Sequence, residues 1–173
     1  MLFLTSDCHF DHANIIEYCH RPFTSVEKMN NAILTGWNQR VKPTDTVIHV
    51  GDFCFGKRAK YWMDQLNGNK IFLAGNHDRN NGVNTKIRSM EIVFNKEPIW
   101  ITHRPHDFND RYYLNLVGHV HDDWLYCPYG VDDTLLINVG VDQWNFKPVR
   151  VDEAYLLYQS IQRTGTLEEV FNA

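Results

Sequence analysis

Five short apolar runs in this chain each end in polar residues of the types that bind metal ions. The clearest run covers residues 70–74, Lys-Ile-Phe-Leu-Ala, and is followed directly by Gly75-Asn76-His77-Asp78. Apolar runs of about four to eight residues bounded by turn residues indicate buried strands. In open α/β sheets, ligands bind at the carboxyl edge of such strands. The sequence therefore predicts an α/β fold that gathers polar side chains at one sheet edge.

The same arrangement recurs four more times along the chain. Any single occurrence is also compatible with an ordinary turn and a surface histidine. The ordered set of five is not explained by ordinary turns, because metal-binding residue types are not expected after every strand by chance. The four runs and the residues that follow them are 2–6 with Asp7 and His9, 46–50 with Asp52, 98–102 with His103, and 114–117 with His119 and His121.

These blocks resemble the motifs of the calcineurin-like metallophosphoesterases. The family's blocks are Asp-x-His, Gly-Asp, Gly-Asn-His-Asp/Glu, a lone His after a strand, and Gly-His-x-His, and all occur here in order from Asp7 to His121. Many members continue the second block as Gly-Asp-x-x-Asp, but here Gly51-Asp52 is followed by Phe-Cys-Phe. The missing Asp is not a metal ligand in the family. Ser-Asp-x-His-Phe at 6–10 and Arg-Pro-Phe at 21–23 are similar to a small group of bacterial and phage-encoded members.

The resemblance implies two groups of metal ligands that share one carboxylate. Oxygen and nitrogen donors of this mixture suit transition metals better than Ca²⁺. We expect two divalent transition-metal ions, manganese first, with iron, zinc, cobalt and nickel as alternatives. The ligands implied are Asp7, His9, Asp52 and His121 for one ion, and Asp52, Asn76, His103 and His119 for the other.

The resemblance also implies a catalytic role for His77, which adjoins a ligand but is not one in the family. Two divalent ions lower the pKa of a water between them and screen phosphate charge, so the expected reaction is attack of a metal-bridging hydroxide on a phosphate ester. His77 is then a candidate general acid for the leaving oxygen. We expect Asp78 to orient His77 and raise its pKa. The alternative for His77 is a structural hydrogen bond within the turn.

Three residues are candidate substrate contacts. Arg21 lies on the loop after the first ligand block, and a guanidinium suits phosphate oxygens; an ordinary surface arginine is the alternative. His12 follows the same block and is equally compatible with a solvated loop. Asn76 is expected to face substrate as well as metal. His49, inside an apolar run, is expected to be a buried structural histidine.

The order of elements up to residue 78 is strand, helix, strand, helix, strand, which favours right-handed, mostly parallel βαβ units. Helical spacing predicts helices over 24–37, 57–66 and 152–163, the first with a capping box from Thr24 to Glu27. We predict a four-layer αββα sandwich: two mixed sheets face to face, flanked by helices. Residues 1–173 are expected to form one metallophosphoesterase domain without a cap domain.

Composition limits the class of partner. Net charge is −4 and there is no Lys/Arg run, which disfavours a nuclease gripping long duplex nucleic acid. No apolar run approaches the roughly 20 residues that span a bilayer, and the first residues do not resemble a signal peptide. The scattered cysteines favour free thiols and a cytoplasmic location.

Among phosphoesterases, the sequence favours a phosphodiesterase acting on a cyclic or short nucleotide. Without a cap domain the metals should lie in an open groove, and few cations are expected there to favour a dianionic monoester. Candidate faces for base stacking are Tyr112, Tyr113, Trp124 and Tyr126, with burial in the protein as the alternative. The alternatives are a phosphomonoesterase on a small metabolite or nucleotide, and a catalytically silent interaction scaffold. Scaffolds of this family typically lack the general-acid histidine or several ligands, whereas this chain has His77 and every ligand block.

Overall fold

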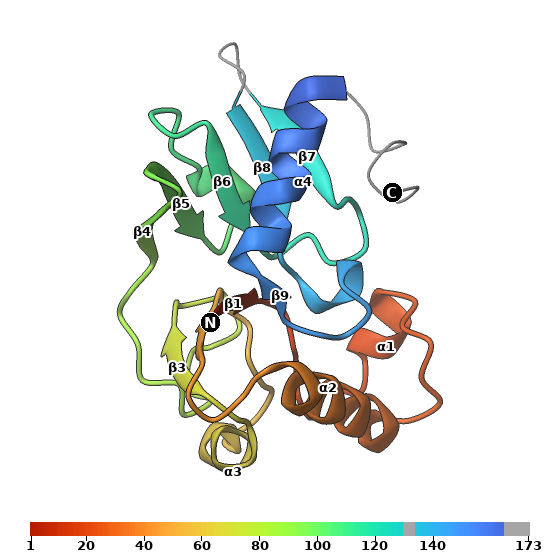
Figure 1. The fold of residues 1–173 in the computed structure, drawn as a ribbon. Coiled ribbons are helices and arrows are strands. Elements are labelled where there is room, and N and C mark those ends of the chain that lie inside the picture. The colour runs from red at the N-terminus through yellow and green to blue at the C-terminus, as the bar shows by residue number, and fades with distance from the viewer. Residues whose placement is uncertain (130–133, 165–173) are drawn as a thin grey trace.

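The computed structural model describes residues 1–129 and 134–164, which form two β-sheets with helices (Figure 1). In the first sheet, three parallel strands lie in the order β3-β2-β1, and β9 adds to β1 in antiparallel orientation. Thr46 lies opposite both Leu2 and Asn69, so the parallel strands end level with one another. The strands are β1 (Leu2–Thr5), β2 (Thr46–His49), β3 (Asn69–Phe72) and β9 (Val149–Arg150).

The second sheet has the order β4-β5-β6-β8-β7. Strands β4 and β5 form a hairpin: they pair antiparallel across a turn in which Asn95 and Lys96 have φ of 50° and 68°. Strands β5, β6 and β8 are parallel, and β7 is antiparallel to β8. The strands are β4 (Ser89–Phe94), β5 (Glu97–Thr102), β6 (Leu114–Val117), β7 (Tyr126–Tyr129) and β8 (Thr134–Asn138).

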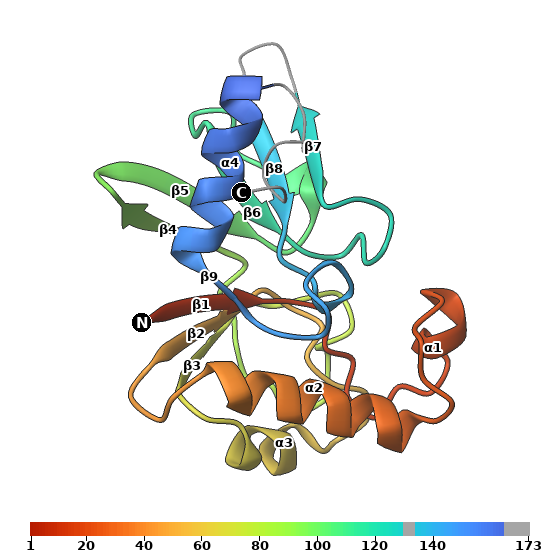
Figure 2. The same ribbon diagram turned by 45° about the vertical axis from the view of Figure 1, so that its right-hand side comes forward.

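Helices α2 and α3 cover the outer face of the first sheet (Figure 2). The apolar residues of α2 recur at helical spacing, so Met29, Ile33 and Trp37 pack against Phe3 and Val47 of the sheet. The cap of α2 is Ser25, whose hydroxyl accepts from the Lys28 amide at 3.3 Å, rather than the predicted Thr24. The helices are α1 (Ile15–Tyr18), α2 (Val26–Arg40), α3 (Ala59–Gln65) and α4 (Val151–Thr164), with 3-10 turns η1 (Pro105–Asp107) and η2 (Val141–Gln143).

A second core lies between the sheets. Successive strand residues face opposite sides, so Phe3 joins the helix-side core while Leu4 meets Ile101 and other residues of the second sheet. The predicted pair of mixed sheets with helices is confirmed, with one refinement. Ala154 and Tyr155 of α4 join this inter-sheet core, so α4 does not form a separate outer layer. No helix in residues 1–129 or 134–164 is long and apolar enough to cross a bilayer.

Candidate metal centre

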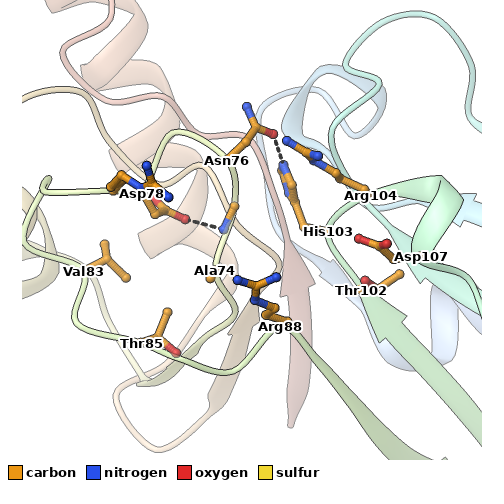
Figure 3. Close-up of a pocket in the computed structure, with 12 residues that line it drawn as sticks. Ala74, Asn76, Asp78, Val83, Thr85, Arg88, Thr102, His103, Arg104 and Asp107 are labelled. Carbon is orange, nitrogen blue, oxygen red and sulfur yellow. Dashed lines mark hydrogen bonds between the residues drawn. The ribbon is translucent and has the colours of Figure 1, made fainter.

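The ligand loops of both sheets meet at the carboxyl ends of the parallel strands. Each of two residue groups places its candidate ligand atoms within 4.8 Å of one another. Asn76 joins the second group, because its Oδ1 lies 3.0 Å from His103 Nε2 (Figure 3). The structure therefore brings together every residue for which metal ligation is predicted. The groups are Asp7, His9 and His121, and Asp52, His103 and His119.

The Asp52 carboxylate lies between the two groups. Its Oδ2 is 3.6 Å from Nε2 of His9 in the first group and 3.5 Å from Nε2 of His103 in the second. Its Oδ1 accepts a hydrogen bond from the His77 amide at 2.8 Å. One oxygen is thus held by backbone while the other faces both groups, as a bridging carboxylate requires.

Buried polar atoms without partners show that the donor set fits a cation. Within the described residues, Asp7 Oδ1 and His9 Nε2 are buried and have no hydrogen-bond partner. An unpartnered buried polar group costs about 1–3 kcal/mol. Burial also raises the pKa of Asp7 and lowers that of His9, since it disfavours either charge. A divalent cation between these atoms would satisfy both.

Two other ligand histidines carry raised pKa values. His103 Nδ1 lies 2.8 Å from the Val50 carbonyl, which leaves Nε2 for a metal. Burial favours its neutral form, but the hydrogen bond and negative charge of Asp52 outweigh burial and raise the His103 pKa to about 9. For His121 the hydrogen bond to Asp142 likewise outweighs burial and raises the pKa to about 10. Both shifts reflect the acidic partners of these two rings, whereas burial lowers the pKa of His119 as it does that of His9.

Asp142 supports the centre and was not predicted from the sequence. It lies in η2, after the carboxyl end of β8, and its Oδ2 is 3.1 Å from His121 Nδ1. This contact orients the His121 ring and leaves Nε2 free for the metal. The strand-end pattern could have suggested it, because the apolar run 135–139 is followed by Gly140-Val-Asp in the same way as the ligand strands.

Arg21 lies inside the protein with its guanidinium engaged by protein groups, which corrects the expected phosphate contact. It is 4% exposed, and its Nε and Nη2 donate to the Asp142 carboxylate at 2.7 and 2.8 Å. Nη2 also donates to the Asp7 carbonyl, while Nη1 donates to the Cys8 carbonyl and Met29 Sδ. These contacts use all five N–H groups of a guanidinium. The buried loop carbonyls need donors, and Arg21 supplies them.

The backbone at the ligands is strained. A positive φ is rare for residues other than glycine and costs of order 1–3 kcal/mol. The conformation persists because the loops are packed from all sides: a Cβ on Gly75 would lie 2.1 Å from Asp52 Oδ1, and one on Gly118 would lie 2.1 Å from Ser6 Oγ. The left-handed ligands are Asp7 (57°), His9 (48°), Asp52 (57°), His119 (75°) and His121 (44°).

Asp78 holds the ligand loops rather than the His77 ring, which corrects the predicted pairing. Its Oδ2 accepts from the amides of Asp52 and Gly75, each at 2.8 Å, and its Oδ1 from the Phe53 amide at 2.9 Å and Asn81 Nδ2 at 2.8 Å. The carboxylate is buried and saturated by these donors. His77 is exposed, and its ring centroid lies 5.3 Å from that of His9.

Of the other predicted contacts, His12 lies at the centre, and Tyr112 and Tyr113 do not. His12 Nδ1 is 3.2 Å from His9 Nδ1, and its ring stacks on Phe55 at 4.6 Å. Tyr112 and Tyr113 immediately precede β6, whereas the ligands follow its carboxyl end. They therefore lie at the wrong end of the strand for base stacking. His49 is fully buried, as predicted.

Comparison with known proteins identifies the family. The model of the calcineurin-like phosphoesterases matches residues 2–165. The chain belongs to this family. It is 37% identical to the uncharacterized protein MJ1445 of Methanocaldococcus jannaschii, over 98% of this chain and 97% of that protein. Its fold is similar to that of AQ665, a protein of unknown function from Aquifex aeolicus, with a TM-score of 0.66, 24% identity, and 91% and 98% of the two chains covered.

Replacing Asp142 with Asn should weaken metal binding by about 10–100-fold, because the partner that orients His121 loses its charge. The measurement is competition for metal between this phosphoesterase and a chelator of known affinity. Asp64→Asn is the matched control, since Asp64 is exposed on α3 and pairs with Lys60. Equal metal affinity in Asp142→Asn and wild type would show that Asp142 does not position the ligand.

Proposed function

We propose that this phosphoesterase hydrolyses a small phosphodiester, such as a cyclic or short nucleotide, with two divalent transition-metal ions. One observation carries the proposal: two adjoining ligand groups face a single carboxylate oxygen, Asp52 Oδ2, with unpartnered buried atoms turned toward the space between them. The intact ligand set and His77 favour an enzyme over an interaction scaffold of the same fold.

The residues divide into those that hold metal and those that act on the ester. Asp7, His9 and His121 would hold one ion, and Asn76, His103 and His119 the other, with Asp52 between them. Manganese is the first choice for this donor set. When bound, such ions supply an activated water and screen the negative charge of the phosphate.

We infer that His77 protonates the leaving oxygen. Its amide is anchored to Asp52 Oδ1, so the residue is fixed beside the ligand groups. Its side chain is exposed and lies against the His9 ring. The ring can therefore reach an ester bound over the centre and transfer a proton to the departing alkoxide. His12, stacked on Phe55 beside His9, borders the same side and would contact the ester.

The charge around the first ligand group favours a diester. Arg21, the cation nearest in sequence to Asp7 and His9, is committed to Asp142 and backbone carbonyls. Arg21 therefore cannot neutralise the second charge that a monoester carries near neutral pH. The arginines Arg79, Arg88 and Arg104 line a pocket on the side of the second ligand group instead. A diester phosphate has only one charge and two ester arms, which suits an open site bordered by the exposed Asn76 and His77.

Purified protein reconstituted with Mn²⁺ should bind two ions per chain and hydrolyse bis(4-nitrophenyl) phosphate. Excess chelator should abolish the activity, and added Mn²⁺ should restore it. Elemental analysis and the nitrophenol assay measure the two properties. Full activity in excess chelator, or a single ion per active chain, would contradict the dinuclear assignment.

His77→Ala should keep both ions and slow hydrolysis of the dinucleotide thymidylyl-(3′→5′)-thymidine by about 10²–10⁴-fold, since its alkoxide needs a proton. The loss on bis(4-nitrophenyl) phosphate should be much smaller, because nitrophenolate departs unprotonated. His20→Ala, at a histidine whose side chain is 87% exposed, is the matched control. Equal losses on both esters would indicate that His77 binds phosphate instead.

The diester preference is tested with matched esters. We expect kcat/KM to be a few-fold higher for bis(4-nitrophenyl) phosphate than for 4-nitrophenyl phosphate, because the dianion lacks a cation at the first ligand group. Thymidylyl-(3′→5′)-thymidine and thymidine 5′-phosphate form a second pair, in which both leaving groups are alkoxides. A preference for the monoester in both pairs would establish a phosphomonoesterase.

A further inference from the structure

A polar pocket adjoins the second ligand group. Its volume is about 420 Å³, within the range of about 300–1,000 Å³ typical of small-molecule sites. Asn76 and His103 form part of its wall, so the pocket opens directly beside the candidate metal centre. Three arginines also line it: Arg79, Arg88 and Arg104.

The arginines reach the pocket from different segments. Arg79 follows the Gly-Asn-His-Asp block, Arg88 precedes β4, and Arg104 follows the ligand His103. Figure 3 shows the guanidinium groups of Arg88 and Arg104 turned into the pocket, that of Arg104 beside Asn76 and His103. Folding thus gathers three positive charges at one side of the centre.

Within residues 1–129 and 134–164, no hydrogen bond or ion pair engages these three guanidinium groups. Other arginines of the chain are paired: Arg40 donates to Glu153 at 2.5 Å, and Arg58 lies 3.3 Å from Asp11. Like charges that line one pocket without direct partners repel one another. A bound anion would relieve this repulsion.

Two carboxylates also line the pocket, but neither forms an ion pair with the three arginines, which outnumber them. The Asp78 carboxylate is saturated by three backbone amides and the Asn81 side chain. Asp107 is exposed, with its Oδ1 3.6 Å from His106 Nε2. Apart from His103, the remaining polar side chains are neutral; Thr85, for example, donates its hydroxyl hydrogen to the Phe72 carbonyl. The pocket keeps an excess of positive charge.

We propose that this arginine pocket binds a second phosphate group of the substrate, separate from the phosphate that is hydrolysed. The inference rests on the proposed function, because the ester must lie over the adjoining ligand groups. A guanidinium offers paired N–H donors that match phosphate oxygens. The substrate class is therefore a phosphodiester that carries an additional phosphate, such as a nucleotide with a terminal phosphate.

The test compares two diesters with the same leaving group, thymidine 3′-(4-nitrophenyl phosphate) with and without a 5′-phosphate. In the metal-loaded wild type, the 5′-phosphate should raise kcat/KM about tenfold, mainly through KM. Arg88→Gln and Arg104→Gln should each reduce this preference severalfold, and the double variant should remove it. Arg163→Gln, on α4 and outside the pocket, should keep it.

Two results would overturn the proposal. In one, the 5′-phosphate does not raise kcat/KM of the wild type. In the other, the double variant loses the same factor on both esters, which would mean that the arginines act on the hydrolysed phosphate.

A binding measurement tests the pocket even if the protein does not hydrolyse these esters. If the metal-loaded wild type hydrolyses neither ester, calorimetry compares binding of thymidine 3′,5′-bisphosphate and thymidine 3′-phosphate. Tighter binding of the bisphosphate in wild type and Arg163→Gln, but not in the double variant, would support the pocket independently of turnover. Equal binding of the two nucleotides in the wild type would overturn it.

Discussion

The site depends on two carboxylates buried side by side between the sheets. Asp7 is 0% exposed and Asp52 is 1% exposed, and burying like charges is unfavourable unless each finds partners. One oxygen of each carboxylate accepts a hydrogen bond from a backbone amide of another ligand loop. The His119 amide donates to Asp7, and the His77 amide donates to Asp52, both at 2.8 Å. The second oxygen of each faces the ligand groups. The carboxylates thus join loops of different strands while directing negative charge to one place.

A layer of ion pairs and hydrogen bonds fixes these carboxylates and the histidines around them. Asp78 ties the loop after β3 to the loop after β2 through buried backbone amides. Asp142 and Arg21 connect η2, His121 and the loop after β1. These contacts hold strained, left-handed ligand residues in a single orientation. Pre-positioned ligands bind metal without a large ordering penalty.

Charge is distributed unevenly over a chain that is acidic in total, with a formal net charge of −4. Carboxylate oxygens and imidazole nitrogens face the candidate metal centre, while guanidinium groups without ion-pair partners line the adjoining pocket. This distribution of charge favours an anion that extends from the metal centre into the arginine pocket. The net charge bears only on the binding of long polyanions such as duplex nucleic acid. It does not reveal this local separation of charge.

The sequence by itself determined the two-sheet architecture and the metal-ligand candidates. A strand followed by polar residues places them at the carboxyl edge wherever the strand lies in a parallel sheet, so local spacing was sufficient for Asp7, Asp52 and His103. The roles of Asp78 and Arg21 were decided only by the tertiary structure, as was the contribution of Asp142. Their partners are distant along the chain: Arg21 and Asp142 are 121 residues apart. Which donor satisfies a buried carbonyl or carboxylate depends on how the sheets pack, and no local pattern encodes that packing.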